Sequence, residues 1–345
     1  MRNVKRALAL LLAAALAAVL FGCSPAITKT TEDGKQVYKI IYAGTVPDSN
    51  AITVAFNWMA EELLERSDGQ LEMHIYSNNT LGDSRSNIES MQTASVQMGE
   101  CSSAPLAMFT DAYMPLSLPF FFSDYENAYN FVESDLADEL ADELAEEVGV
   151  RPLGWMLNGA RGISNNKNRV IDDPSDLNGL KIRVMENDIY LETFETLGAA
   201  PTAMSLAEVF TGLQQGTIDG QDNPPGITCS NKFYEVQTNY STLNHCIDMV
   251  PVLVSEEWYQ SLPEDLRQIF VEVLEETVAY ERELMESYEE SDLETIATSC
   301  EVTELTDEQR QVFKDACQPV YDWFETQYPE LDLQRYLDVA AESAT

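Results

Sequence analysis

Strand-like and helix-like patterns of apolar residues alternate along the first part of the chain. Residues 38–42 are rich in the aromatic and β-branched residues typical of strands, and residues 71–76 alternate as a strand with one buried face does. Apolar residues at helical spacing lie between them, a further helix is predicted from about residue 84, and a short strand is predicted at 96–98. This β-α order predicts an α/β lobe with a largely parallel sheet.

A second unit of the same kind follows an acidic segment. Residues 123–126, Ser-Asp-Tyr-Glu, have the pattern of a capping box and predict one acidic helix that continues to about Val148. Gly198 and Gly216 mark two later helix ends. The elements predicted here are strands at 152–157 and 180–184 and helices at about 187–197 and 205–215. We therefore expect a second α/β unit with its own sheet.

The last third of the chain predicts one long helix. From Glu264 to about Ser299 there is neither glycine nor proline, and Leu266, Phe270 and Leu274 recur every four residues. A continuous helix of that length would reach roughly 50 Å at 1.5 Å per residue, which exceeds one small lobe. We expect it to lie across both lobes.

Length and charge narrow the class of protein. A chain of 345 residues has room for about two domains, and its 45% hydrophobic content excludes disorder for most of it. The 20 Lys and Arg residues against 59 Asp and Glu residues give a formal net charge of −39. Nucleic-acid binding depends on cations that neutralise phosphates, so this charge excludes it. The charge alone names no partner.

The N-terminus predicts export. A basic start precedes fifteen apolar residues at 7–21, fewer than the roughly 20 that a spanning helix needs, so residues 1–22 read as a signal peptide. Leu-Phe-Gly-Cys at 20–23 resembles a bacterial lipobox, which implies lipid modification of Cys23; the alternative is an ordinary secretory signal with an incidental cysteine. Membrane association is expected through this anchor only, followed by a flexible tether over 23–37.

The remaining cysteines do not form a disulfide framework. They are odd in number and widely spaced, without a Cys-X-X-Cys pair. The two closest in sequence near the C-terminus make the pair to test for a bridge, whereas buried free thiols are the favoured alternative. The five residues are Cys101, Cys229, Cys246, Cys300 and Cys317, and the pair to test is Cys300–Cys317.

The usual catalytic motifs are absent from the sequence. There are two histidines, and no HExxH, GxSxG, GxGxxG or Walker pattern. Carboxylates are so frequent that no pair of them can be nominated as a catalytic dyad. We therefore predict that the protein is not an enzyme and uses no metal or cofactor.

Basic residues, by contrast, concentrate in one segment. Removing residues 1–22 leaves 17 cations and a net charge of 17 − 59 = −42, and six of these cations fall within 151–183. A small anion needs such local donors, and the planar fork of arginine suits a carboxylate. The alternative is that each cation balances a nearby acid. The six are Arg151, Arg161, Lys167, Arg169, Lys181 and Arg183.

Several ordered segments resemble a known family. Residues 180–184 (Leu-Lys-Ile-Arg-Val), 193–202 and 208–224 resemble the extracytoplasmic solute receptors of TRAP transporters, the DctP family. Residues 81–85 and 232–236 match the same family, and the likeness runs from about residue 38 to the C-terminus. It implies an α/β fold of two lobes, a periplasmic-binding-protein-like clamshell with a hinge and a long helix that spans both lobes.

The resemblance also implies a carboxylate clamp in the second lobe. Arg183 matches the arginine that binds the ligand carboxylate in a bidentate manner, Arg161 a second arginine that supports it, and Asn223 an asparagine that hydrogen-bonds the same group. The alternatives are ion pairs within the fold for the two arginines and a turn-forming role for Asn223.

Other contacts are implied less directly. Ser84 and Ser102 fall where the first lobe supplies polar contacts to the rest of the ligand, and His245 where some receptors for sugar acids have a second-lobe contact; a capping or core role for His245 is the alternative. Leu206 stands where the family commonly carries an aromatic residue that stacks on the ligand. The polar side chains of Ser84, Ser102 and His245 favour a sugar acid or a similar hydroxy acid as the ligand.

The sequence thus predicts an exported receptor, in the periplasm or on the outer face of the cell membrane. It would capture a small organic acid, a sugar acid or a dicarboxylate, and deliver it to the membrane subunits of a TRAP permease. The predicted lobes are 38–158 plus 249–288 and 159–248 plus 289–345. A ligand-binding sensor or chemotaxis component is the first alternative, and a cell-surface hydrolase the second.

Overall fold

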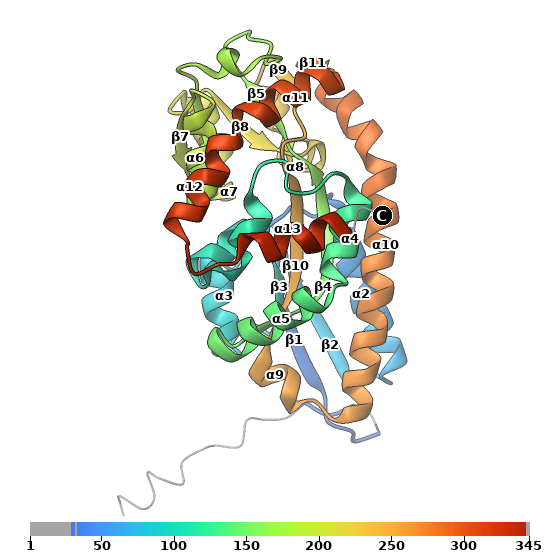
Figure 1. The fold of residues 1–345 in the computed structure, drawn as a ribbon. Coiled ribbons are helices and arrows are strands. Elements are labelled where there is room, and N and C mark those ends of the chain that lie inside the picture. Colours follow the sequence, from blue (N-terminus) through green and yellow to red (C-terminus); the bar gives the residue numbers. More distant parts are fainter. Residues whose placement is uncertain (1–28, 32, 343–345) are drawn as a thin grey trace, which may run out of the picture.

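Two β-sheets, each covered by helices, form the two lobes of the protein (Figure 1). The computed structural model describes residues 29–31 and 33–342. The first lobe, drawn at the bottom of Figure 1, is built on a five-stranded sheet, and the second lobe on a six-stranded sheet. The predicted two-lobed α/β architecture is therefore confirmed.

The first lobe follows the predicted pattern closely, with Asn50 capping its first helix by accepting from the backbone N–H of Ile52. The strand predicted at 96–98 lies two residues later. Its elements are β1 (Tyr38–Ala43), α2 (Ala51–Arg66), β2 (Leu71–Tyr76), α3 (Ser84–Gln92), β3 (Met98–Glu100), the 3-10 helices η1 (Ala104–Met108) and η2 (Asp111–Ser117), α4 (Tyr125–Val132), α5 (Asp135–Glu147), β4 (Val150–Ala160), β10 (Ile247–Ser255) and α9 (Glu256–Ser261).

The sheet of the first lobe has the strand order β2-β1-β3-β10-β4. β1 runs parallel to β2 and β3, whereas β10 runs antiparallel to both β3 and β4. The expected largely parallel sheet is thus mixed, because β10 returns from the second lobe. Every residue of β10 is buried, as is usual for a strand covered on both faces.

The acidic segment forms two helices, α4 and α5, so the prediction of one continuous helix is wrong. Asp124 caps α4 by accepting from the N–H of Asn127. Ser134 then accepts from the N–H of Ala137 and starts α5. A serine side chain that bonds to the local backbone favours a new helix start over continuation of the preceding helix.

The second lobe has the strand order β11-β9-β5-β8-β6-β7. β6 runs parallel to β7 and β8, and β5 runs antiparallel to β8 and β9. Gly216 ends α7 in the left-handed conformation that glycine adopts without strain. The elements are β5 (Gly162–Asn165), η3 (Pro174–Leu177), β6 (Lys181–Val184), α6 (Asp188–Thr196), β7 (Ala200–Ala203), α7 (Leu206–Gln215), β8 (Gly220–Asn223), α8 (Pro225–Ser230), η4 (Phe233–Val236), β9 (Asn239–Thr242), β11 (Glu301–Glu304) and α11 (Asp307–Ala316).

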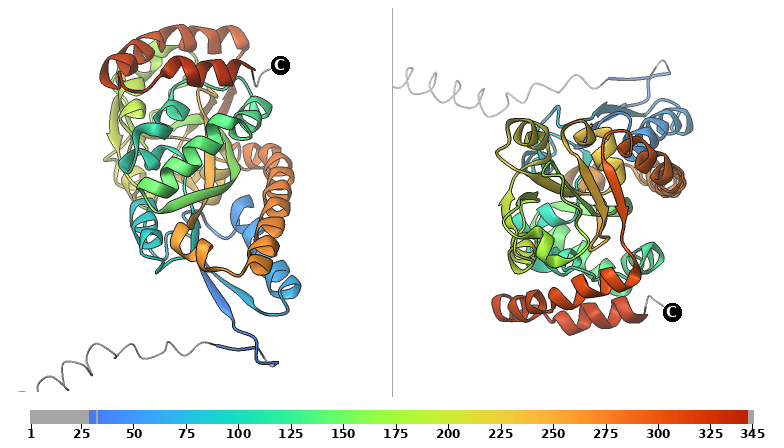
Figure 2. Two further views of the ribbon diagram at one scale, coloured as in Figure 1. Left: turned by 60° about the horizontal axis from the view of Figure 1, so that its bottom comes forward. Right: turned by 90° about the horizontal axis from the view of Figure 1, so that it is seen from above.

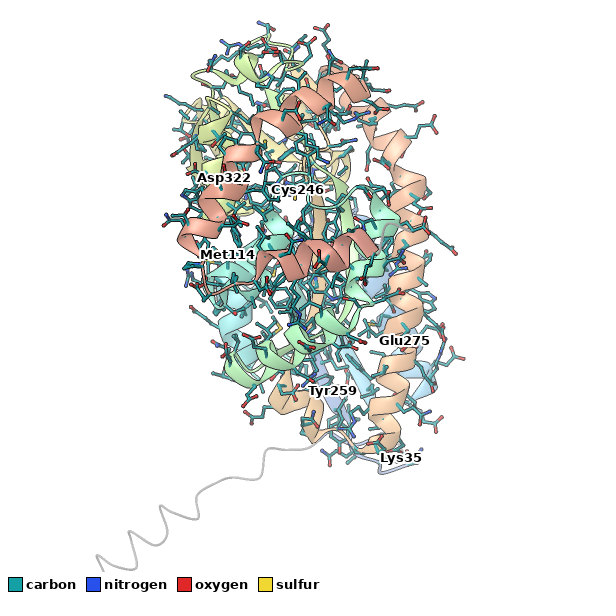
Figure 3. The ribbon with its side chains drawn as sticks, in the orientation of Figure 1. Lys35, Met114, Cys246, Tyr259, Glu275 and Asp322 are labelled. Carbon is teal, nitrogen blue, oxygen red and sulfur yellow. The ribbon has the colours of Figure 1, made fainter. Side chains whose placement is uncertain are left out.

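Two chain segments cross between the lobes side by side. β4 continues into β5 through Arg161, and β9 continues into β10 through residues 243–246. The backbone N–H of Arg161 donates to the Cys246 carbonyl at 2.9 Å, and the N–H of Asn244 donates to the Arg161 carbonyl at 2.9 Å. Figure 3 places Cys246 near the centre of the molecule. We call this pair of hydrogen-bonded crossings the hinge segment.

A single helix, α10 (Glu264–Ile296), runs along one side of both lobes (Figures 1 and 2). It packs on α2 and β4 of the first lobe and on α8 of the second. Its 33 residues confirm the predicted long helix that spans the molecule.

The C-terminal helices α12 (Gln318–Gln327) and α13 (Leu333–Glu342) lie with α11 as a layer on one face of the molecule (Figure 2). α12 packs on α6, and α13 packs on α4. The Tyr336 hydroxyl donates to the Ala112 carbonyl at 3.0 Å, and Asn127 Nδ2 donates to the Ala340 carbonyl at 2.6 Å. The lobe boundaries stay a prediction, with α13 as a segment that contacts the first lobe.

The predicted signal peptide and Cys23 lie outside the described residues. Part of the predicted tether is described. Within it, Thr30 and Gln36 form a β-bridge, and two lysines tie it to the first lobe. Lys29 pairs with Glu72 at 2.5 Å, and Lys35 pairs with Asp68 at 3.1 Å. Within residues 29–31 and 33–342, none of the helices combines the length and apolar character needed to cross a membrane.

The five described cysteines are free thiols, so the disulfide considered between Cys300 and Cys317 is not formed and that prediction is wrong. Cys300 packs with Tyr240 and Ile296, whereas Cys317 belongs to the separate core of the second lobe. Burial raises the pKa of Cys300 to about 11 and that of Cys317 to about 12. Both thiols are therefore protonated at neutral pH, as the alternative of buried free thiols expects.

Candidate ligand site between the lobes

A cavity between the lobes brings together five of the seven predicted ligand contacts. It holds about 540 Å³ of space, part of it open to solvent. The predicted residues that line it are Arg183, Asn223, Ser84, Ser102 and Leu206, whereas Arg161 and His245 are not among its lining residues.

Arg183 enters the cavity from the middle of β6. Its neighbours Ile182 and Val184 point into the apolar core, and the alternation of a strand turns Arg183 to the other face. The side chain is 3% exposed; Nε donates to the Met204 carbonyl at 2.8 Å, and the buried Nη1 has no hydrogen-bond partner. Burial, and next the nearby Arg161 charge, lower the pKa of Arg183 to about 10. A bound anion would remove this unsatisfied charge.

Arg161 lies beneath the cavity, with its charge already matched. Nε donates to Asp222 Oδ1 and Nη1 to Asp248 Oδ2, both at 2.8 Å. Nη2 donates to the Asp222 carbonyl and, at 3.1 Å, to Asn223 Oδ1. Burial opposes its charge, but the carboxylates hold the pKa of Arg161 above its ordinary value. The structure thus places Arg161 behind two cavity residues, Asn223 and Asp248.

The two carboxyl groups around Arg161 respond differently to burial. Burial would raise the pKa of Asp222, but the Arg161 guanidinium holds it below the ordinary value. Burial dominates at Asp248 and raises its pKa despite the contact with Arg161. Asp248 lines the cavity, so a charged group placed there would shift its ionisation.

Half of the six cations of the basic segment identified in the sequence form ion pairs with nearby acids. Arg151 bonds to Asp142 and Glu256, and Lys167 pairs with Asp219 at 2.9 Å. Arg169 Nη1 donates to the backbone carbonyls of Asp176 and Asn178. Ion pairs with nearby acids therefore account for Arg151, Lys167 and Arg161, whereas Arg169 is held by backbone carbonyls. Arg183 is the member of the segment that carries an unpaired buried N–H into the cavity.

Asn223 ends β8 and is held by the same network. Its Oδ1 accepts from Arg161, and its Nδ2 donates to Gln221 Oε1. The Tyr240 hydroxyl donates to its backbone carbonyl at 3.0 Å. The amide is therefore fixed at the cavity wall, where it can meet a ligand only in this orientation.

The first lobe and the hinge supply polar groups to the opposite part of the cavity. Ser84 is the first residue of α3, directly after the cap Asp83. Ser102 Oγ donates to Asp248 Oδ2 at 3.2 Å, and Asn158 Nδ2 donates to the same oxygen at 3.1 Å. Leu206, the first residue of α7, supplies an apolar contact from the second lobe.

His245 takes the core position that was the alternative to ligand contact. It is 1% exposed, and its ring packs edge-on against Phe194 at 5.5 Å. Its Nε2 lies 3.7 Å from Asp222 Oδ2. His245 thus faces the ion-pair network beneath the cavity.

Sequence reasoning missed several lining residues, with Asp248 the most informative. Asp248 is the one charged residue in the otherwise apolar stretch 247–254, and that contrast could have identified it. Thr45 is another: its N–H donates to Glu100 Oε1 at 2.7 Å and its hydroxyl to Oε2 at 2.8 Å. Nothing local in the sequence marks Thr45, because its partner is distant along the chain.

Two lobes joined by a hinge, with a buried cationic group in the cavity between them, define a solute-binding receptor. The chain belongs to bacterial extracellular solute-binding protein family 7, the DctP family of TRAP solute receptors, whose model matches residues 42–327.

Curated relatives are similar over most of their length. The C4-dicarboxylate-binding periplasmic protein DctP of Vibrio cholerae is 32% identical over 295 residues, which cover 85% of this chain and 88% of the relative. The 2,3-diketo-L-gulonate-binding periplasmic protein YiaO of Escherichia coli is 29% identical over 322 residues, 92% of this chain and 96% of the relative.

Solved structures share the fold. The sugar acid binding protein DctPAm of Advenella mimigardefordensis, in complex with galactonate, has a TM-score of 0.85 and 26% identity, covering 89% of this chain and 99% of that one. A TRAP periplasmic solute binding protein of Shewanella oneidensis with bound succinate has a TM-score of 0.84 and 26% identity, covering 90% and 100%.

Proposed function

We propose that this protein captures a small organic acid, a sugar acid or a dicarboxylate, by its carboxylate. The observation that carries the proposal is Arg183, whose buried Nη1 lacks a partner and lines the cavity between the lobes. A carboxylate can accept two charge-assisted hydrogen bonds from one guanidinium. The ligands named for the relatives and for the solved structures, C4-dicarboxylates, galactonate and succinate, all carry such a group.

Closure of the lobes follows from where the ligand contacts lie. Arg183 and Asn223 belong to the second lobe, and Ser84 and Ser102 to the first, so one ligand touches both sides of the hinge. A ligand that contacts both lobes stabilises the arrangement in which they meet. Arg161 acts in this mechanism as a positioning residue, because it holds Asn223 and Asp248 and is itself absent from the cavity wall.

We further propose that the receptor is exported, anchored by a lipid on Cys23, and delivers its acid to a TRAP permease. The family supports export, and the apolar segment that ends at Cys23 supports the anchor. Mass spectrometry of the protein from native membranes should find a lipid on an N-terminal Cys23, and Cys23→Ser should move the protein to the soluble exported fraction. An unmodified N-terminus at another residue would contradict the anchor.

Thermal melting against a panel of organic acids tests the binding function. A ligand at 100 times its dissociation constant adds about 2.7 kcal/mol to the free energy of unfolding, which should raise Tm by roughly 5 °C for this size. Arg183→Ala should remove the shift, whereas Arg267→Ala, which deletes an exposed ion pair with Glu264, should keep it. A shift that survives Arg183→Ala would overturn the assignment. Recovery of the unaltered acid would separate a receptor from a hydrolase.

A further inference from the structure

The charges along the cavity wall are asymmetric. Among the described residues that line the cavity, Arg183 is the one cation, whereas Asp83, Glu186 and Asp248 carry carboxyl groups. Glu186 is exposed, Asp83 is half-buried, and Asp248 is 3% exposed. The cavity thus offers one anchor for an anion and several acceptors for hydrogen-bond donors.

The buried carboxyl groups of Asp222 and Asp248 both pair with Arg161, which leaves Arg183 without a carboxylate partner. Arg161 and Arg183 contribute two positive charges, and Asp222 and Asp248 two negative ones, all in side chains that are at most 3% exposed. A monocarboxylate adds one negative charge next to the unpaired Nη1 of Arg183. A second carboxylate on the same ligand would add another without a cation to receive it, and a buried unpaired charge is strongly disfavoured.

Asp248 is rigidly presented in this wall. It is the second residue of β10 and lies opposite Gly159 of β4, next to the hinge segment. Ser102, Asn158 and Arg161 all donate to Oδ2, so its second oxygen, Oδ1, receives none of these three bonds. A ligand hydroxyl can donate a charge-assisted hydrogen bond to a carboxylate oxygen held in this way.

The neighbouring first-lobe groups suit hydroxyls as well. Asp83 Oδ1 caps α3 by accepting from the N–H of Ser86 at 2.9 Å, which holds this carboxylate in place. The remaining polar lining, Thr45, Asn79 and Ser84 among it, consists of hydroxyl and amide groups that donate and accept.

From these features we infer that the cavity selects an organic acid with one carboxylate and several hydroxyl groups, and that Asp248 is the residue that discriminates against a second carboxylate. The inference rests on the proposed function and narrows its ligand class to hydroxylated monocarboxylates. Discrimination arises because a terminal hydroxyl donates to the acidic wall, whereas a terminal carboxylate is repelled by it.

Matched pairs of acids test this directly. Galactonate and galactarate differ only at the last carbon, which is a primary alcohol in one and a carboxylate in the other; erythronate and meso-tartrate form the same pair with four carbons. The purified protein is unfolded, dialysed and refolded to remove bound acid, then titrated with each acid in a calorimeter. Each monocarboxylate should bind at least about tenfold tighter than its diacid.

Three variants localise the discrimination. Asp248→Asn keeps the shape and the acceptor oxygen, and should reduce the preference for the monocarboxylate by at least about threefold. Asp83→Asn retains a good helix cap and should reduce it less, because Asp83 is only half-buried. Asp265→Asn removes an exposed acid from the first turn of α10, outside the cavity, and should leave the ratio unchanged. Melting curves without ligand establish that each variant is folded.

Each outcome is decisive. Equal binding of the two members of either pair by the native protein, or a ratio that Asp248→Asn does not change, would overturn the inference while leaving the receptor function intact. Absence of binding by the folded protein to every acid, including succinate, would overturn the proposed function and the inference together. A reduced ratio in Asp248→Asn, with folding preserved and the Asp265→Asn control unaffected, supports the assignment.

Discussion

Two buried arginines lie close together in this protein and differ in almost every physical respect. Arg161, in the hinge, donates to Asp222, Asp248 and Asn223, whereas Arg183, in β6, has a single backbone partner in Met204 and an unpaired Nη1. Their pKa values move in opposite directions from the ordinary value for arginine.

The comparison shows that burial alone does not define a ligand site. The charge of Arg161 is compensated inside the fold, so its role is structural and positioning. Arg183 forms no ion pair among the described residues, and the partner that we propose for it is the ligand carboxylate. A buried cation that lacks its carboxylate is therefore the feature to look for.

The largest effect is expected from Arg161→Met. The substitution would leave Asp222 and Asp248 buried without their cation and should lower the free energy of unfolding by about 3–5 kcal/mol. Urea unfolding at pH 7, followed by circular dichroism, measures it. A loss below 1 kcal/mol would mean that the network beneath the cavity is not held by this ion pair.

Arg183→Ala, in contrast to Arg161→Met, should weaken ligand binding without lowering the stability of the protein. Affinity for the acid should fall by at least about 2 kcal/mol, the scale for removing one side of a buried charged contact. Stability without ligand should stay equal or rise, because an uncompensated buried charge is removed. Calorimetry and melting of the same preparation check both, and Arg183→Lys should recover only part of the affinity since it lacks the planar fork. If Arg183→Ala instead lowers the free energy of unfolding, Arg183 has a structural role like that of Arg161.

Glu281 on α10 is a further buried ionisable group, and it extends the comparison to a carboxyl group. It is fully buried, and burial raises its pKa to about 8, only partly offset by the Leu157 backbone amide and by Arg282. The folded state therefore retains a proton that the unfolded chain releases near its ordinary value, so this contribution to stability is complete at low pH and is lost as the pH rises toward and through 8.

Glu281→Gln should remove this pH dependence. At pH 9 the variant should be more stable than the native protein by about 1–3 kcal/mol, with the difference shrinking toward pH 5. Melting curves between pH 5 and pH 9 measure it, with the exposed Glu275 on α10 (Figure 3) as the matched control in Glu275→Gln. A native protein whose stability does not fall over this range would contradict the buried, protonated state.

The smallest effect is expected from a reducing agent. The five described cysteines are free, so dithiothreitol should shift the Tm of the protein by less than about 1 °C, whereas a bridge that contributes 2–4 kcal/mol would produce a clear drop. Counting the thiols of the unfolded chain with a thiol-specific reagent gives an independent measure.

Local sequence patterns predicted correctly those elements whose formation depends on neighbouring residues. The strands at 38–42 and 71–76 and the helix from Glu264 follow from side-chain periodicity and the absence of breakers. The break between α4 and α5 could not be predicted from the pattern, because the free energy that the Ser134 cap contributes differs little from that of continuing the helix. The antiparallel course of β10 depends on its return across the hinge, which no local pattern encodes.

In the candidate site, too, the sequence predicted one part and the tertiary structure determined the other. Residue types, their order and the family resemblance were enough to nominate Arg183, Asn223, Ser84, Ser102 and Leu206, all of which line one cavity. Which arginine is compensated could not be read from the chain, since Asp222 and Asp248 lie 61 and 87 residues from Arg161. Pairing energies depend on distance and burial in space, so folding alone decided that Arg161 holds the hinge and that Arg183 is left facing the cavity.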